Sequence, residues 1–506
     1  MSRTVALVRD GWFDLLRENS PLLRETIEWV PSEGLRDSPL LAMFAGLLFY
    51  GTPHRRLKGL RLFVGATRAA ATNRRVLEPI DRALILTSAS VSYRLIGRAT
   101  LGVKPARTAM RILNEMSDAD RQRVHALPRV YSHLGATLYY GGHVDEALSA
   151  FEHGLAEVPR QGYPHGFMNL AMLAGIHALQ GTLRESETYL VAARSPDWSD
   201  TTRSMYPGTY YRIAEATVAL EVFDTATARQ HLEAMVHDRA TIEHWIPIAL
   251  TEAMTNLVDG RPGEALAGLD AFAASRQKEG RSATAKNQLA PMRALLQLAL
   301  ENPDAAVAIL DRDAAPGPAR DISRARTDLL LGRHGAALHR LRRLAGATLT
   351  SRLSVEASAL EAACVLRIAD QVRTRPTLER LGATLAASGQ RLALALLPAA
   401  DFDRVQAALR TTGYQAVVAA LPAVSLIPEI GGERLLSERE HAVLQALVNT
   451  SSNAAIANDL VVSVNTVKTQ LRSIYRKLGV STRDEAIAVA LARHLASVHP
   501  PSQPPR

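Results

Sequence analysis

Apolar residues recur at helical spacing along most of this chain. From about residue 10 to residue 420 they fall three or four positions apart, and short breaks of Gly, Pro or Asp separate one amphipathic segment from the next. Sustained alternation of apolar and polar residues, which a half-buried strand requires, is not found. The pattern therefore predicts an all-α protein.

Residues 131–159 contain one unit of a helical repeat. Its landmarks resemble the tetratricopeptide motif, although Gly154 stands where that motif usually has Ala. The spacing has a physical basis, because two antiparallel helices approach closely only where small residues face each other and a larger residue fills the adjacent gap. The landmark residues are Tyr131, Leu134, Gly135, Leu138, Ala147, Phe151 and Pro159.

The same template fits five further units. The small residues of the second helices would be Ala147, Ser186, Ala228, Ala265, Ala306 and Ala337. The small residues of the first helices, twelve positions earlier, would be Gly135, Ala174, Ala216, Ala253, Ala294 and Ala325. The large residues, four positions after the second set, would be Phe151, Leu190, Leu232, Leu269, Leu310 and Leu341. Since the units lie 31 to 42 residues apart, we predict an irregular tetratricopeptide-like helical-repeat solenoid, with an irregular helical bundle as the alternative.

The regions around these repeats are less regular. A similar helix pair is expected in residues 38–70, and the four residues Pro422, Pro428, Gly431 and Gly432 indicate a break in the helical chain. We therefore divide the chain into an N-terminal helical region of the solenoid (1–125), the tetratricopeptide-like repeats (126–345), two or three closing helices (346–420), a linker (421–435), a final module (436–495) and a disordered tail (496–506).

Four short helices are expected in the final module. Glu440, three positions after Ser437, completes a capping box at the start of the first helix. The second and third helices are separated by the short stretch VVS, which predicts a helix-turn-helix. The first helix is expected to open with Ser437, the second to start after Ser452-Asn453, the third after Ser463, and the fourth at either Ser481 or Thr482.

The outer face of the third helix is cationic. Residues 452–483 contain five Lys or Arg residues and one acidic residue, Asp459, so they carry +4 of the chain's net charge of +9. A cationic helix face of this kind suits the major groove of DNA. The positions outside the expected core are Asn465, Lys468, Thr469, Arg472, Tyr475, Arg476 and Lys477.

Three stretches of the module match a known pattern without a gap. LSEREHAVL, SNAAIANDL and TVKTQLRSIYRKLGV resemble the LuxR/NarL-type helix-turn-helix of transcriptional regulators, over roughly an eighth of the chain. Three positions depart from the family: Gln470 replaces a frequent His, Thr450 stands where Gly is usual, and Ala455 replaces a common Glu. None of these departures removes a cationic residue.

The resemblance implies roles for particular residues. Lys468, Thr469 and Arg472 match positions of the recognition helix that approach base edges, and Gln470 keeps the ability to hydrogen-bond a base or a phosphate. The fourth helix matches the one through which the family often pairs its DNA-binding domains, so a homodimer on double-stranded DNA is expected. Phosphate contacts are expected from Ser452, Asn453, Asn465, Thr466, Tyr475 and Lys477.

A helical solenoid followed by this module resembles the MalT-like group of large LuxR-type regulators. Those regulators carry an ATP-binding module before the solenoid, and the present sequence begins directly in helices. We therefore expect a DNA-binding transcriptional regulator without an ATP switch, whose solenoid senses a small-molecule or protein effector. The alternative is a protein-binding scaffold in which the DNA-binding module is secondary.

Composition limits the other classes of function. No Gly-Lys dipeptide, HExxH or GxSxG occurs and the fifteen His residues show no metal spacing, so we expect neither an enzyme nor a cofactor or metal site. The single cysteine, Cys364, lies in an apolar run and is expected to be buried. Early charges argue against a secretory signal, and the apolar run 40–50 is too short to cross a bilayer, so a cytoplasmic protein is expected.

One basic stretch lies outside the module. Residues 53–75 contain seven Lys or Arg residues and no acidic residue. Two interpretations remain open at this point: solvated helix faces, or a second surface for nucleic acid or for a partner.

Overall fold

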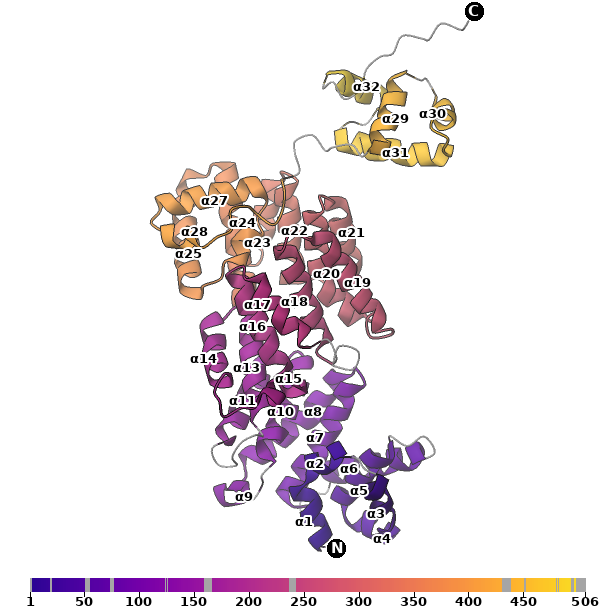
Figure 1. Cartoon of the computed structure of the whole chain (residues 1–506), viewed down its shortest axis with the longest axis vertical. Coiled ribbons are helices and arrows are strands. Elements are labelled where there is room, and N and C mark those ends of the chain that lie inside the picture. The colour runs from indigo at the N-terminus through magenta and orange to yellow at the C-terminus, as the bar shows by residue number, and fades with distance from the viewer. Residues whose placement is uncertain are drawn as a thin grey trace, which may run out of the picture. The chain divides into compact units, whose positions relative to one another are not determined.

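The chain folds into two compact units, residues 1–427 and 428–506. Within the part that the structure describes, all regular elements are helices, and one isolated bridge joins Pro398 to Ile427 (Figure 1). The all-α prediction is therefore confirmed. The computed structural model describes residues 2–18, 21–50, 55–72, 77–122, 124, 126–158, 166–235, 243–429, 438–449, 452–478, 480, 482–492 and 496.

The first unit begins with α1 (Ser2–Asp10), α2 (Trp12–Glu18), α3 (Pro21–Glu28), α4 (Ser32–Asp37), α5 (Pro39–Tyr50), α6 (Arg56–Thr72), α7 (Pro79–Leu95), α8 (Ala99–Asn114) and α9 (Asp118–Gln122). Six helix pairs follow: α10 (Leu127–Tyr140) with α11 (Val144–Ala156), α13 (Phe167–Gln180) with α14 (Leu183–Ala193), α16 (Thr209–Glu221) with α17 (Thr225–Glu233), α18 (Trp245–Val258) with α19 (Pro262–Ser275), α20 (Ala283–Ala299) with α21 (Pro303–Asp313), and α22 (Pro318–Leu330) with α23 (His334–Arg342). The short helices α15 (Asp200–Ser204) and η2 (Tyr206–Gly208) precede α16.

The six helix pairs coincide with the six units of the repeat. All eighteen template residues are buried, and in each unit they join the two helices of one pair. In the first pair a methyl group on Gly135 would lie 2.7 Å from the Phe151 ring, so only glycine allows α10 and α11 to approach this closely. In the second pair the Ser186 hydroxyl donates a 2.9 Å hydrogen bond to the carbonyl oxygen of Ala174. The tetratricopeptide-like solenoid is thus built on the contacts that the template described.

Two further helix pairs precede these repeats. The pair expected in residues 38–70 is α5 with α6, in which a methyl group on Gly46 would lie 2.9 Å from the Gly59 carbonyl oxygen. The pair α7 with α8 was not recognised in the sequence. Its first helix buries polar residues, among them Asp81, Ser90 and Arg94, and these interrupt the apolar pattern from which helix faces are inferred.

The solenoid ends in α24 (Ser351–Ile368), α25 (Gln371–Ser388), α26 (Leu392–Ala395), α27 (Ala399–Thr411) and α28 (Gln415–Ala419). These are five helices, two of them short, where the sequence predicted two or three. The chain then stays packed as far as Ile427, which is fully buried and accepts a 3.0 Å hydrogen bond from the Ala399 amide. The first residues of the expected linker therefore belong to the first unit, and residues 430–437 lie outside the described part of the chain.

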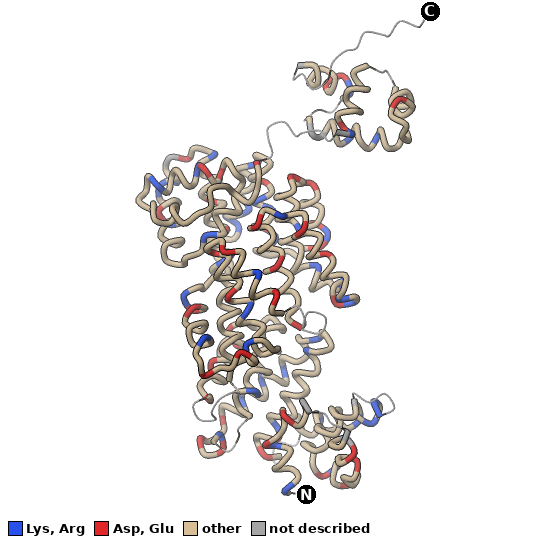
Figure 2. The backbone as a smooth tube through the Cα atoms, viewed as in Figure 1, with Lys and Arg blue, Asp and Glu red and all other residues tan. Residues whose placement is uncertain are grey.

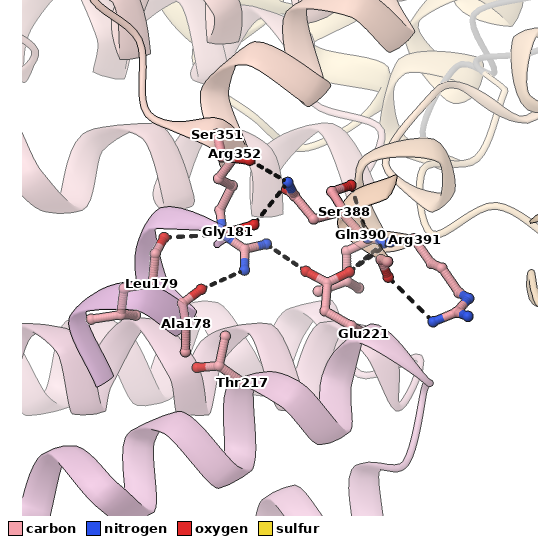
Figure 3. A network of polar contacts seen from close by, with 12 residues as sticks. Ala178, Leu179, Gly181, Thr217, Glu221, Ser351, Arg352, Ser388, Gln390 and Arg391 are labelled. Carbon is pink, nitrogen blue, oxygen red and sulfur yellow. Dashed lines mark hydrogen bonds and ion pairs between the residues drawn. The ribbon is translucent and has the colours of Figure 1, made fainter. Parts of the chain in front are cut away.

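A polar clamp joins the end of the solenoid to its middle (Figure 3). Arg352, at the start of α24, donates to the carbonyl oxygens of Ala178 and Leu179 at 3.0 and 3.1 Å, and to the carboxylate of Glu221 at 2.7 Å. The second carboxylate oxygen of Glu221 accepts from the amides of Arg391 and Leu392 at 2.7 and 3.0 Å. Segments 131 to 174 positions apart are thereby held side by side.

Replacing Glu221 by Gln should destabilise the first unit. The variant removes the charge that compensates Arg352, and loss of one partner from a buried ion pair costs about 3 kcal/mol. Calorimetry of the full chain should show a lower unfolding temperature for Glu221→Gln than for wild type. The exposed Glu233 offers the control, because Glu233→Gln should unfold like wild type. Equal unfolding temperatures for the two variants would contradict the role of the clamp.

A buried cluster of ring side chains and one ion pair connects α7, α10 and the residues before α18. Arg94 donates to Glu243 at 3.1 Å, and Glu243 also accepts from the Tyr206 hydroxyl. The His244 ring stacks on Tyr206 and Tyr140, with ring centroids 5.1 and 5.4 Å apart. In this cluster burial shifts the pKa values of the histidines more than any charged neighbour does.

This cluster should make the first unit sensitive to acid. Burial lowers the pKa of His244 to about 4 and, with Arg94 nearby, that of His133 to about 3, from an ordinary value of 6.5. Below about pH 6.5 these histidines bind a proton in the unfolded chain but not in the folded chain. The free energy of unfolding therefore decreases by about 1.4 kcal/mol for each histidine when the pH is lowered by one unit. Denaturant unfolding followed by tryptophan fluorescence from about pH 7 to about pH 5 measures this slope. His244→Gln should reduce the slope, and substitution of the exposed His441 should not.

The second unit consists of α29 (Glu438–Asn449), α30 (Asn453–Asp459), α31 (Val464–Leu478) and α32 (Arg483–Ala492). All four contribute to one core, and the predicted four-helix arrangement is confirmed. No helix that the structure describes, in either unit, has the length and apolar character needed to cross a membrane. The core residues of the second unit are Val443, Leu444, Leu447, Ile456, Ala457, Val467, Leu471, Ile474, Leu478, Ala486 and Ala490.

The turn between α30 and α31 contains a strained residue. Val461 has a φ of +51° although its side chain is β-branched, and the side chain is 91 % exposed. The left-handed conformation is unfavourable for such a residue and open to glycine. No packing contact offsets the strain, because the side chain points into solvent.

Val461→Gly should therefore stabilise the helix-turn-helix. Relief of the left-handed strain outweighs the extra chain entropy of glycine, and we expect a net gain of about 1 kcal/mol. Hydrogen exchange of the α30 and α31 amides in the full chain measures this gain as slower exchange. The control is Val464→Gly, at the first residue of α31. This variant should give faster exchange, because glycine weakens a helix. Faster exchange in both variants would show that Val461 is not strained.

Candidate nucleic-acid interface

Each helix of the helix-turn-helix begins at a side-chain cap. The Ser452 hydroxyl accepts a 3.2 Å hydrogen bond from the Ala455 amide at the start of α30, and the Ser463 hydroxyl accepts from the Thr466 amide at 3.0 Å before α31. These caps satisfy amides that an α-helix leaves without partners at its N-terminus. The third helix therefore starts after Ser463, as predicted, and the second starts at Asn453, one residue before its predicted start.

One face of α31 presents polar and cationic side chains to solvent. Val467, Leu471 and Ile474 are buried in the core of the unit, and the helix contains no acidic residue. The buried apolar side chains and the exposed polar side chains lie on opposite sides of α31, because each group recurs with the helical period. The exposed side chains among the predicted DNA contacts are Asn465, Thr466, Lys468, Thr469 and Arg472.

This separation of charge differs from the first unit. Along the solenoid, basic and acidic residues are interspersed (Figure 2). Many of them form ion pairs, such as Arg194 with Glu215 at 2.7 Å. On α31, by contrast, Lys468 and Arg472 form no ion pair with any residue that the structure describes. Their charge is available to an anion, and a duplex offers closely spaced phosphates.

Four predicted contact residues lie differently from the exposed set. Gln470 is half-buried, and its side-chain carbonyl oxygen has no hydrogen-bond partner among the described residues. The ring of Tyr475 packs against the core, which corrects its assignment to the outer face, and burial raises its pKa. Asn453 accepts a 3.4 Å hydrogen bond from Arg483. The side chain of Lys477 lies outside the described part of the structure, as does that of Arg476.

Two residues hold the recognition helix in position. Glu440, buried on α29, accepts a 2.7 Å hydrogen bond from the Ser473 hydroxyl on α31, so it links two helices of the unit. Arg483 donates to the carbonyl oxygen of Leu447 at 3.3 Å as well as to Asn453. Arg483 is one of the five basic residues of the segment 452–483, and no sequence signal marks it as a link between α29, α30 and α32.

The fourth helix of this unit begins with a capping box. The Thr482 hydroxyl accepts from the Glu485 amide at 3.2 Å, and the Glu485 carboxylate accepts from the Thr482 amide at the same distance. This reciprocal pair starts α32. The box at Ser437 falls on a residue outside the described part of the chain.

Known proteins are similar to this second unit. Residues 434–490 match the family model for bacterial regulatory proteins of the luxR family. The transcriptional regulatory protein YdfI of Bacillus subtilis (strain 168) is 42 % identical over 66 residues, which are 13 % of this chain and 31 % of YdfI. The HTH-type transcriptional regulator MalT of Yersinia pestis (strain Pestoides F) is 42 % identical over 64 residues, which are 13 % of this chain and 7 % of MalT.

The similarity to these relatives is confined to one part of the chain. Each alignment spans less than a third of the relative, and about an eighth of the present protein. Within that part, the family match, the four-helix core and the uncompensated cations of α31 agree. The chain therefore carries a luxR-family helix-turn-helix domain at residues 434–490.

Proposed function

We propose that the whole protein is a transcriptional regulator that binds DNA in a sequence-specific manner through α31. The observation that carries this proposal is the exposed face of α31, on which Lys468 and Arg472 have no acidic neighbour on their helix. The helix rests on a core formed with α29, α30 and α32. A rigidly supported cationic helix is the element that helix-turn-helix proteins place in the major groove.

The proposal divides the contacts into two groups. Lys468, Thr469 and Arg472 reach base edges, and they account for discrimination between sequences. Contacts to phosphates position the domain without reading sequence. These come from Ser452, Asn453, Asn465, Thr466, Tyr475 and Lys477, and Gln470 would contact a base or a phosphate. The hydroxyl of Ser452 also caps α30, and the ring of Tyr475 also packs against the core.

The remaining parts of the proposal concern assembly and input. Two domains would pair through α32 on DNA, where Leu491 is 37 % exposed and Ile487 and Val489 are half-buried. The solenoid would receive a small molecule or a partner protein, and no catalytic step is assigned to it. Because the ligand is genomic DNA, the protein would act in the cytoplasm.

Substitution of the two cations should abolish specific binding. Each base contact contributes about 1–3 kcal/mol, so the double variant Lys468→Ala/Arg472→Ala should bind its site at least about 30-fold more weakly. Genome-wide occupancy of the tagged full chain identifies the site, and fluorescence anisotropy with that duplex measures the dissociation constant at fixed salt.

The matched control lies in the first unit. Arg342 and Arg343 are exposed, and Arg342→Ala/Arg343→Ala removes the same charge from the chain without changing α31. This control should bind like wild type. If both double variants lose affinity equally, net charge and not α31 determines binding. If the wild-type chain occupies no genomic site, the scaffold alternative replaces the proposal.

A further inference from the structure

Two helices at the start of the first unit have exposed apolar residues that no described part of the chain covers. Both α3 and α6 pack against α5, and each turns one face inward. In α3 the inner residue is Ile27, and in α6 the inner residues include Ala66 and Ala70, all of them buried. The opposite faces are exposed, and they carry large apolar side chains rather than the polar ones that a solvated helix normally presents.

The first of these faces is the α3 stripe, formed by Leu22, Glu25 and Trp29. These residues are three and four positions apart, and the chain continues the helical turn to Trp29, whose amide donates to the Thr26 carbonyl oxygen at 3.2 Å. Leu22 is 73 % and Trp29 81 % exposed. The other three tryptophans of the chain, Trp12, Trp198 and Trp245, are at most 4 % exposed.

The second face is the α6 stripe, formed by Leu57, Leu60, Arg61, Val64 and Arg68. Leu57, Leu60 and Val64 are 73 %, 47 % and 55 % exposed. Arg61 and Arg68 run along one edge of these apolar residues, because they lie four positions after Leu57 and Val64 respectively. This stripe lies within the basic stretch 53–75, which is outside the DNA-binding domain.

The two stripes are complementary and adjoin each other. Glu25 forms no ion pair with a described residue, and neither does Arg61 or Arg68. An ion pair between Glu28 and Arg55 joins the end of α3 to the start of α6, so both stripes belong to one region of the surface.

We propose that this region binds a second copy of the same chain, with the α3 stripe of one protomer on the α6 stripe of its partner. Trp29 would pack among Leu57, Leu60 and Val64, and Glu25 would pair with Arg61 and Arg68. A two-fold arrangement uses the contact twice, which doubles the apolar area buried. Interface hot spots are enriched in tryptophan and arginine, and the two stripes expose both residue types. The apolar rows distinguish the surface from one that binds nucleic acid, for which arginines alone would serve.

The full chain without DNA offers a direct test. Sedimentation velocity at increasing protein concentration should show a monomer converting to a dimer. Acrylamide quenching of tryptophan fluorescence should fall over the same concentrations, because Trp29 is the one tryptophan that solvent reaches in the monomer. A monomer at every concentration, with quenching unchanged, overturns the proposal.

Charge reversal tests which surfaces meet. Glu25→Arg places like charge opposite Arg61 and Arg68, and Arg61→Glu/Arg68→Glu places like charge opposite Glu25, so each variant alone should dimerise at least tenfold more weakly. Mixing the two variants restores opposite charges at both contacts, and the mixture should dimerise as wild type does. The matched controls, Asp403→Arg and Arg342→Glu/Arg343→Glu, change exposed residues elsewhere in the first unit and should dimerise normally.

Three other outcomes contradict the proposal. A dimer that is insensitive to both reversals forms through another surface, such as α32. Failure of the mixed variants to recover, while each stays folded by circular dichroism, means that the two stripes do not face each other. A chain that stays monomeric but loses quenching on vesicles of anionic phospholipid uses this region to bind a membrane surface.

Discussion

The close approach of paired helices at small residues is the constraint on which the first unit depends. Gly135 against Phe151 and Gly46 against the Gly59 backbone leave no space for a larger side chain, and the Ser186 hydroxyl donates a hydrogen bond to the Ala174 carbonyl oxygen. Each such contact fixes how one helix crosses the next, because ridges can enter grooves only where the backbones come near. Repetition of this contact through successive pairs generates the solenoid, and its irregular spacing is tolerated because the turns between helices absorb the difference.

Apolar contacts between neighbouring pairs do not by themselves determine where the solenoid ends. The clamp around Glu221 holds the last helices in one position, because a buried carboxylate is tolerated only where several hydrogen-bond donors meet it. Arg352 and two backbone amides provide those donors in one arrangement of α13, α16, α24 and α26. The cluster around His244 plays a similar part earlier in the chain, at the cost of stability in acid.

The charged residues of the helix-turn-helix domain are arranged differently from those of the first unit. In the first unit many cations are paired with acids, and its net charge of +7 is spread over 427 residues. On α31 the cations are left without acidic partners, while Glu440 and Arg483 are used inside the unit to align its helices. The chain's excess of positive charge therefore has a functional meaning only where it is local. The same distinction separates the α6 stripe, whose arginines border apolar residues, from the recognition helix, whose cations border polar ones.

The sequence by itself determined the all-α class, the six repeated pairs and the helix-turn-helix. Each of these depends on residues within a few turns of one another, such as Gly135 with Ala147 and Phe151, so spacing along the chain is enough to predict them. The tertiary structure alone decided which polar groups meet across the solenoid, that Tyr475 packs inward, and that Trp29 remains outside. Glu221 and Arg352 are 131 positions apart, and their meeting depends on crossing angles accumulated over many helices. No local pattern encodes that sum, because small differences at each contact add up along the stack.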